Sequence, residues 1–169
     1  AEFVQLDLEV CDASRDEIIG VGEGLLVHVL TAVSEHCAAE LERLGRELSI
    51  PEAPFPRIRF QEAQEQFGKG FDDALSASLS APAWVIDFPR AVREFYDRED
   101  PARTDVLLDM DLMYPEGYGE ALSGGEREHT LDRILCRLEQ DGIDKERFSQ
   151  YLGFAEEGLT ASAGFGIGI

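Results

Sequence analysis

The sequence predicts a mixed α/β chain of the α+β type, in which helices flank a mostly antiparallel sheet. Three observations support this prediction. Apolar residues make up 44 % of the 169-residue chain, which is enough for the core of one domain. Strand-like segments follow one another between residues 83 and 122, without the regular strand–helix–strand alternation of a parallel sheet. Segments with apolar residues at helical spacing lie before and after them. Because we find no internal repeat and no linker, residues 1–169 are expected to form a single domain.

The first part of the chain predicts a strand, a long helix and a proline-rich break. Residues 3–10 alternate between two sets of side chains, which is the period of a strand with one polar face. Apolar residues recur at helical spacing over residues 15–48, where we expect one helix capped by Asp12 or Ser14. The segment 51–56 contains three prolines and ends that helix.

The remaining predicted elements are shorter. Compact apolar runs indicate buried strands, apolar residues on one side of a segment indicate helices, and Asp144 is a suitable helix cap. We therefore expect, in order, a short strand at 57–60, a helix at 62–67, a loop or weak helix at 71–82, strands at 83–88, 105–114 and 118–122, helices at 126–140 and 144–157, and a glycine-rich strand at 162–169.

The charge balance is strongly acidic, with 35 acidic against 15 basic residues and a net charge of −20. Such a surface repels phosphate backbones, so we expect no DNA partner and no strong RNA binding through these residues alone. Adaptation to high salt gives the same acidic excess, and the sequence does not separate the two explanations.

Neither a membrane span nor a signal peptide is expected. The chain has no run of about 20 apolar residues, and residues 1–10 lack the basic and apolar parts of a signal peptide. The three cysteines, Cys11, Cys37 and Cys136, are odd in number and lack metal-type spacing. They are expected to be buried, reduced thiols in a cytoplasmic protein.

Carboxylates are concentrated in residues 109–120, and their spacing suggests a metal site. On a strand, Asp109 and Asp111 project to the same face, and Glu120 follows on the next strand. Three carboxylates that face one point repel each other unless a cation lies between them, and Mg²⁺ prefers oxygen ligands. Ser123 can add a hydroxyl oxygen. The alternative is a surface turn with solvated charges.

An arginine and several glycines complete this region. Arg127 presents a planar guanidinium that suits a carboxylate or an amide. Gly164, Gly166 and Gly168 alternate with bulky residues, which leaves one face of a strand bare for a flat ring. Tightly packed strands have the same pattern. Arg93 is expected either to contact a ligand or to bridge the many acids.

Four blocks of the sequence, in order, resemble the catalytic domain of class II aminoacyl-tRNA synthetases in the aspartyl/asparaginyl branch. AEFVQLDLEV resembles the strand after the second motif of that family, and DFPRAVREFYD resembles its P-x-x-x-(K/R)-x-F-Y segment. DLMYPEGYGEALSGGERE resembles its D-L-x-x-P-G-x-G-E loop, and the end of the chain resembles the helix and strand that lead into motif 3. The segment EGLTASAGFGIGI is also similar to tRNA-independent asparagine synthetase-related paralogues.

The resemblance implies ATP and Mg²⁺ as cofactors, and aspartate or asparagine as the amino-acid substrate. Asp111 and Glu120 match acidic ligands of Mg²⁺ and ATP in that family. Ser123 stands at the position that is serine in the aspartyl enzymes and is placed with them as a metal ligand. The resemblance therefore gives Glu120 a catalytic role as well.

The same resemblance assigns the substrate-binding residues. Arg127 matches the catalytic arginine that grips the side chain of the substrate, and Asp7 matches the acid near its α-amino group. Glu2 and Gln5 lie on the same segment as Asp7 and are assigned to the substrate with it. The adenine and ribose of ATP are expected to lie over Gly164, Gly166 and Gly168.

The chain also departs from the family pattern. Glu126 stands where glutamine is usual, and one extra residue lies between Asp111 and Glu120, so the choice between aspartate and asparagine stays open. Motif 1, which forms the dimer interface of the family, and the arginines of motifs 2 and 3 fall outside residues 1–169. The resemblance therefore implies a homodimer whose domain is incomplete here at both ends, and residues 1–169 are expected to be inactive alone.

The expected function is the ATP-dependent activation of aspartate or asparagine as an aminoacyl-adenylate. The acceptor is tRNA in a synthetase, and ammonia or another small amine in a paralogue; the acidity of the chain favours the paralogue. The alternative function is a non-catalytic, synthetase-like module for ligand binding or protein contact.

Overall fold

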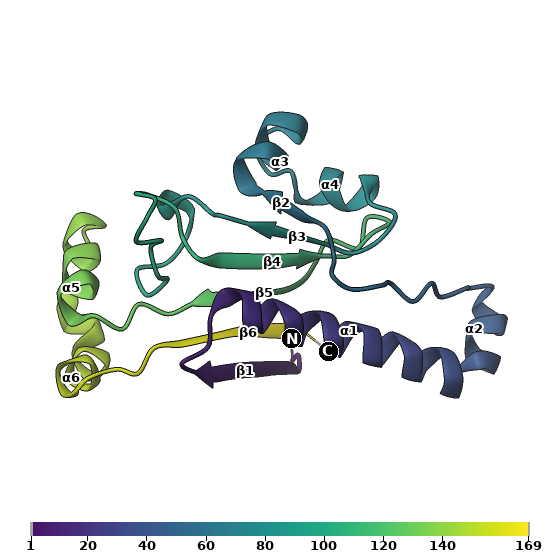
Figure 1. Ribbon diagram of the computed structural model, residues 1–169, viewed down its shortest axis with the longest axis horizontal. Coiled ribbons are helices and arrows are strands. Elements are labelled where there is room, and N and C mark those ends of the chain that lie inside the picture. Colours follow the sequence, from purple (N-terminus) through teal and green to yellow (C-terminus); the bar gives the residue numbers. More distant parts are fainter. Residues whose placement is uncertain (1, 169) are drawn as a thin grey trace.

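The computed structural model describes residues 2–168, which form a six-stranded sheet with helices on its faces and at one end (Figure 1). The strand order is β1-β6-β5-β4-β3-β2, and each neighbouring pair is antiparallel except β2 with β3. The expected mostly antiparallel sheet is therefore confirmed. Ile169, the last residue of the expected C-terminal strand, lies outside the described residues. The strands are β1 (Gln5–Cys11), β2 (Arg57–Arg59), β3 (Ala83–Ile86), β4 (Asp109–Met113), β5 (Glu120–Glu126) and β6 (Ser162–Gly168).

Five of the six helices of the described residues lie in three places around the sheet, and α2 follows the end of α1 away from the sheet (Figure 1). α1 runs along one face, α3 and α4 pack near β2 and β3, and α5 and α6 lie together at one end (Figure 1). Asp144 is a cap, as expected, and accepts the amide hydrogen of Glu146, but it caps a 3₁₀ turn; the helix expected over 144–157 begins only at Ser149. The helices are α1 (Arg15–His36), α2 (Ala38–Leu44), α3 (Phe60–Phe67), α4 (Asp72–Ser78), α5 (Leu131–Gln140) and α6 (Ser149–Glu157), with 3₁₀ turns at Arg90–Val92 and Lys145–Phe148.

The single helix expected over residues 15–48 is wrong, because the chain breaks at Cys37 into α1 and α2. None of the α2 residues is buried, so packing does not extend the helix, and it ends at Gly45 in a left-handed conformation with φ of 61°. Ser14 caps α1: its hydroxyl accepts the amide hydrogen of Glu17, whose carboxylate accepts the amide hydrogen of Ser14 at 2.8 Å.

Strand boundaries differ from the expectations by one or two residues in β1, β2 and β3, and by more in β4 and β5. β4 is shorter than the strand expected over 105–114, because the chain before Asp109 makes only isolated bridges. β5 continues to Glu126 instead of ending at residue 122, so the helix expected from residue 126 begins only at Leu131.

α1 provides the core on its face of the sheet. Its side chains Ile18, Ile19 and Leu26 are buried. Glu23, which is also buried, accepts hydrogen bonds from the indole of Trp84 at 3.0 Å and from the amide of Phe55 at 2.9 Å. The same cluster contains Met110, Leu112, Leu122, Ala163 and Phe165 of the sheet.

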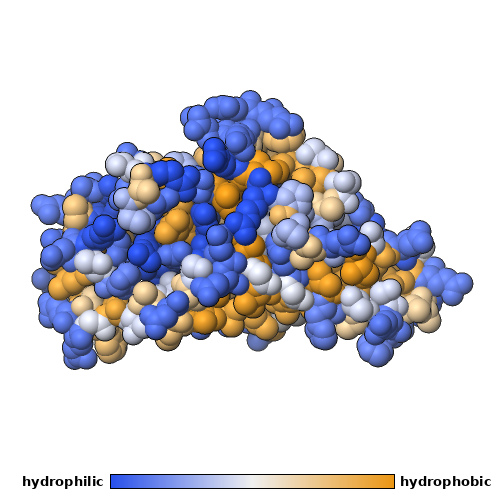
Figure 2. Space-filling model, in the orientation of Figure 1, coloured by the Kyte–Doolittle hydropathy of each residue, from blue (hydrophilic) through white to orange (hydrophobic). Residues whose placement is uncertain are grey.

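Within residues 2–168, α1 is the one helix that is long and apolar enough, by length and composition, to cross a membrane. The core helix of a globular domain passes the same test, and α1 lies on the sheet with its buried side chains facing the core. Apolar surface remains over β1 and α1 (Figure 2), where Leu6, Val10, Val21 and Val29 are exposed.

The expectation of buried cysteines is wrong. Cys11 and Cys136 are exposed, Cys37 is half-buried, and all three are free. Cys11 ends an edge strand, and Cys37 lies at the break between α1 and α2, where the core does not reach.

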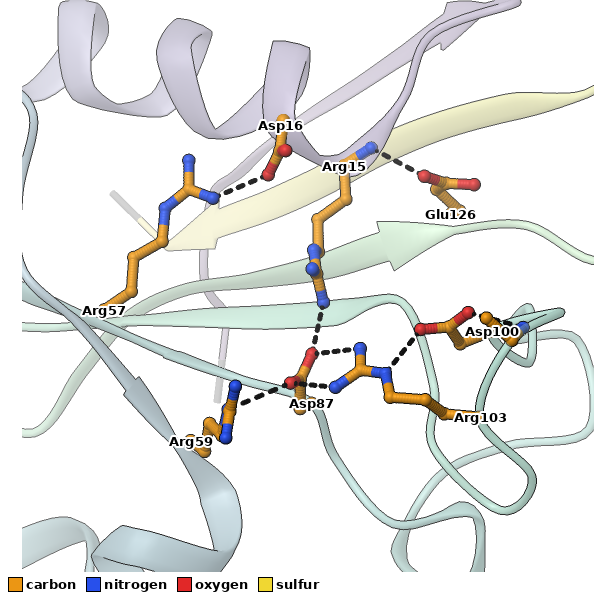
Figure 3. A network of polar contacts seen from close by, with 9 residues as sticks. Arg15, Asp16, Arg57, Arg59, Asp87, Asp100, Arg103 and Glu126 are labelled. Carbon is orange, nitrogen blue, oxygen red and sulfur yellow. Dashed lines mark hydrogen bonds and ion pairs between the residues drawn. The ribbon is translucent and has the colours of Figure 1, made fainter.

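A network of ion pairs ties the start of α1 to the ends of β2 and β3 (Figure 3). Asp87, at its centre, accepts hydrogen bonds from Arg15 and Arg103, each at 2.9 Å, and Arg59 lies 3.7 Å away. Burial alone would raise the pKa of Asp87, but the hydrogen bonds from Arg103 and Arg15 outweigh it and hold this pKa below its usual value.

Candidate active site

Four neighbouring strands, β1, β6, β5 and β4, present a polar face opposite α1. Along β4, Met110 and Leu112 pack in the core under α1, so Asp109 and Asp111 lie on the other side. The strand registers align two rows of residues across this face. One row is Asp7, Gly166, Ser123 and Asp111, and the other is Glu9, Gly164, Gly125 and Asp109.

Two glycines of β6 let side chains of β1 extend over the sheet. A Cβ atom on Gly166 would collide with the side chains of Gln5 and Asp7. One on Gly164 would collide with the backbone of Leu8 and Glu9, so Gly164 requires glycine, whereas at Gly166 the close atoms belong to side chains that can move. Gly168, by contrast, has open space around it.

The guanidinium of Arg93 lies between the two aspartates of β4. Its Nη2 atom is 2.5 Å from Oδ2 of Asp111, and its Nε atom is 3.4 Å from Oδ2 of Asp109. It also lies 3.8 Å over the ring of Phe88. Arg93 was expected either to contact a ligand or to bridge acidic residues, and in the structure it bridges Asp109 and Asp111.

Arg127 is held in a similar way between two carboxylates. Its Nη2 atom lies 3.3 Å from Oε2 of Glu9, and its Nη1 atom lies 3.4 Å from Oδ1 of Asp97. Each of the two arginines on this face therefore has a carboxylate on either side of it.

Two adjoining cavities on this face collect most of the residues predicted for the site. A cavity of about 260 Å³ is lined by Gln5, Asp7 and Arg127, together with Arg93 and Asp97. Its neighbour, of about 360 Å³, shares some of these walls. Glu2 is exposed, precedes β1 and lines neither of these cavities. The walls of the second cavity include Gln5, Glu120, Ser123, Gly166 and Gly168.

Burial raises the pKa values of three aspartates on this face, Asp97, Asp109 and Asp111. The pKa of Asp109 rises to about 8, first through burial and then through the negative charge of Asp97, while Arg93 opposes the rise. Burial also raises the pKa of Asp97, opposed by Arg127, and the pKa of Asp111, opposed by Arg93.

The raised pKa of Asp109 predicts that its contribution to stability is lost as the pH rises. Its carboxyl has a pKa of about 8 when folded and an ordinary value of 3.8 when unfolded, so the folded state binds the extra proton between these values. The contribution is fully present below about pH 3.8 and is lost as the pH rises through about 8. Asp109→Asn removes this titration. The free energy of unfolding in urea, variant minus wild type, should therefore be more favourable to the variant at pH 8 than at pH 5. An equal difference at both pH values would contradict the assignment.

The residues expected to bind Mg²⁺ fit it as a partial ligand set. Ser123 pairs with Asp111 across the strands, and Oδ1 of Asp111 is buried without a hydrogen-bond partner. The pKa of Glu120 is raised by burial and then by the charge of Asp111. Within residues 2–168 no three His, Cys, Asp or Glu residues are placed to hold a metal, so the expected cluster of Asp109, Asp111 and Glu120 is wrong. Two carboxylates and a hydroxyl suit a Mg²⁺ that takes its other oxygens from phosphate and water.

Sequence reasoning misses three acidic residues of this face, Glu9, Glu94 and Asp97. Glu9 continues the alternation that places Gln5 and Asp7 on one face, so the signal for it is present in the sequence. Asp97 has no such local signal, because it reaches the site through an isolated bridge between its segment and Arg127.

Glu126, which stands where the family usually has glutamine, belongs to the opposite face. Its carboxylate accepts a hydrogen bond from the backbone amide of Arg15, at the start of α1, and one from Arg98, each at 2.9 Å. The side chain is buried there and does not line either cavity.

A larger, mainly apolar cavity of about 440 Å³ lies between α1 and the turn after β4. Its rim carries one ion pair, between Arg46 and Glu116, but no set of polar groups that converge on one point. The polar face is therefore the better candidate for chemistry.

The chain is similar to proteins of known sequence family and structure. A sequence model of the family "tRNA synthetases class II (D, K and N)" matches residues 1–169. A crystal structure of asparaginyl-tRNA synthetase from Pyrococcus horikoshii is similar with 29 % identity and a TM-score of 0.87, over 98 % of this chain. The chain spans 43 % of the length of that protein.

Two further structures extend this comparison. The Pyrococcus horikoshii enzyme complexed with asparaginyl-adenylate is 28 % identical, with a TM-score of 0.87, over 98 % of this chain and 42 % of the other. An aspartyl-tRNA synthetase from Entamoeba histolytica, 23 % identical over 98 % of this chain and 38 % of the other, has a TM-score of 0.81 and shares the fold.

Proposed function

Because the chain belongs to the class II tRNA synthetases (D, K and N), we propose that it carries the amino-acid-activating site of an ATP-dependent ligase. Aspartate or asparagine would react with ATP to give an aminoacyl-adenylate. The observation that carries the proposal is the pocket in which Asp7 and Arg127 lie together beside the glycines of β6. The similar Pyrococcus horikoshii enzyme complexed with asparaginyl-adenylate supports it.

The residues of the pocket suit the two ends of an amino acid. Asp7, which is exposed, is placed to accept hydrogen bonds from the α-amino group. Arg127 offers a planar set of donors to the oxygen of a side-chain carboxylate or amide. With both ends of the amino acid held in this way, its α-carboxylate would attack the α-phosphorus of ATP. A new P–O bond forms, the bond between the α-phosphorus and the bridging oxygen breaks, and pyrophosphate leaves.

The second cavity suits the nucleotide. Gly168 lines it with open space around it, which leaves its backbone accessible to a flat base or ribose, whereas the side chains of Gln5 and Asp7 extend over Gly166. Glu120 and Ser123 line this cavity and would hold Mg²⁺ together with Asp111, which pairs with Ser123 across the strands but does not itself line the cavity. When bound, this ion supplies positive charge to the phosphate oxygens.

The acceptor of the activated amino acid is the finer part of the proposal. A tRNA acceptor is what the family name describes, and ammonia or another small amine is the acceptor in tRNA-independent paralogues. The net charge of −20 opposes contact with a phosphate backbone through these residues and favours the small amine. Homodimer formation and a cytoplasmic location stay predictions.

The test is ATP–pyrophosphate exchange by the full-length protein, with aspartate and with asparagine, in the presence and absence of tRNA. We expect exchange with at least one of the two amino acids and without tRNA. If the folded protein supports exchange with neither amino acid under any of these conditions, the ligase proposal fails. A non-catalytic, ligand-binding module would then be the better account.

A further inference from the structure

The cavity of about 260 Å³ that is proposed to bind the amino acid is called the amino-acid pocket below. Both of its arginines already have carboxylates of the protein beside them. Arg127 lies between Glu9 and Asp97, and Arg93 lies between Asp109 and Asp111. The pocket is lined by four acidic residues, Asp7, Glu94, Asp97 and Asp109, against the two guanidiniums, and the raised pKa of Asp109, about 8, leaves the other three to carry the negative charge at neutral pH. The side-chain carboxylate of aspartate would therefore enter a site that already has more negative than positive groups.

The two carboxylates beside Arg127 differ in how firmly they are held. Glu9 has a side chain that is 45 % exposed and accepts one further hydrogen bond, from the hydroxyl of Ser162 at 2.7 Å, so water can replace its partners when a ligand approaches Arg127. Asp97 is buried, with 6 % of its surface exposed. Its Oδ2 atom accepts the amide hydrogen of Glu94 at 3.1 Å, while Oδ1 faces Arg127.

The turn that carries Asp97 is itself anchored. The backbone amide of Asp97 donates a hydrogen bond to the carbonyl of Glu94 at 3.2 Å, and the same carbonyl accepts a hydrogen bond from the buried Arg137 of α5 at 3.0 Å. Asp97 is therefore a fixed part of the pocket wall, and a substrate side chain that reaches Arg127 meets it as well.

We propose that Asp97 is a specificity-determining residue, which makes the pocket prefer the neutral amide of asparagine to the carboxylate of aspartate. This inference rests on the proposed function and concerns the same site. An amide can accept a hydrogen bond from Arg127 through its oxygen and donate one to Asp97 through its NH₂ group. A carboxylate has no hydrogen to donate and places a like charge beside Asp97, which selects against it.

The experiment compares kcat/KM for asparagine and aspartate in ATP–pyrophosphate exchange, with the full-length protein and two variants. Asp97→Asn keeps an oxygen that can accept the amide hydrogen of Glu94 but removes the charge. Asp100→Asn is the matched control, because Asp100 also accepts a backbone amide hydrogen and pairs with an arginine, and it lies outside the amino-acid pocket. We expect the wild type to favour asparagine by at least about tenfold. Asp97→Asn should narrow this ratio by about tenfold, and Asp100→Asn should leave it unchanged.

The outcomes separate this inference from the proposed function. A wild type that uses aspartate as well as asparagine overturns the inference and leaves the proposed function standing. An unchanged ratio in a folded Asp97→Asn protein, checked by its melting temperature, overturns it in the same way. If Asp97→Asn does not fold, the wild-type ratio alone decides. Absence of exchange with both amino acids defeats the proposed function and the inference together.

Discussion

Arg127→Lys is expected to lower kcat/KM for amino-acid activation by about 100- to 1000-fold. Arg127 uses Nε and both Nη atoms toward Glu9 and Asp97, and its planar guanidinium is the group best placed to grip a substrate side chain in the pocket. Lysine keeps the positive charge, but one ammonium cannot reproduce this fork of donors. ATP–pyrophosphate exchange by the full-length protein measures the effect.

Arg133→Lys serves as the control for this substitution. The side chain of Arg133 is 52 % exposed, lies 3.7 Å from Glu128, and does not line the amino-acid pocket. Its activity should match that of the wild type. A loss of less than about threefold in Arg127→Lys would mean that Arg127 does not contact the substrate.

Gly124→Ala is expected to lower the free energy of unfolding by about 3 kcal/mol and the melting temperature by roughly 6–12 °C. Gly124 lies on β5 in the middle of the sheet, and a Cβ atom there would collide with the carbonyl oxygen of Gly164 and approach Cα of Phe165 to 2.7 Å. These are backbone atoms of the paired strand β6, so the sheet itself must move. Thermal unfolding followed by circular dichroism measures the loss.

The matched control for Gly124→Ala is Gly20→Ala in α1. A Cβ atom at Gly20 meets nothing within 4 Å, and alanine in a helix interior is preferred to glycine by about 0.5–1 kcal/mol. Gly20→Ala should therefore be as stable as the wild type or more stable. If Gly124→Ala melts at the wild-type temperature, the close approach of β5 and β6 at this position is wrong.

Local patterns in the sequence predict the parts of the site that lie on regular strands. The two-residue period places Gln5 and Asp7 on one face of β1, and Asp109 and Asp111 on one face of β4, as the structure confirms. The same period extends to Glu9. Such patterns suffice at these positions because the apolar residues that alternate with them, Leu8 on β1 and Met110 and Leu112 on β4, pack in the core under α1.

Contacts between distant segments could not be predicted in this way. Asp97 meets Arg127 only through the folding of its loop against the end of β5, and no periodicity records that meeting. The metal cluster was expected because Asp109 and Asp111 share a face, but the cation that lies between them comes from Arg93 of another segment. The break in the helix expected over 15–48 could not be predicted for the same reason. The apolar periodicity continues into α2, but none of the α2 residues is buried, so no core supports a continuous helix there.

The network around Asp87 has a consequence for the order in which the molecule assembles. Its arginines come from the start of α1, the end of β2 and the loop before β4, which are far apart along the chain. Closing the loops between these segments costs chain entropy before the contacts form, so we expect the network to form late in folding. Interactions that form after the transition state slow unfolding without accelerating folding. Asp87 therefore lengthens the lifetime of the folded state, and the sheet that carries the pocket opens less often.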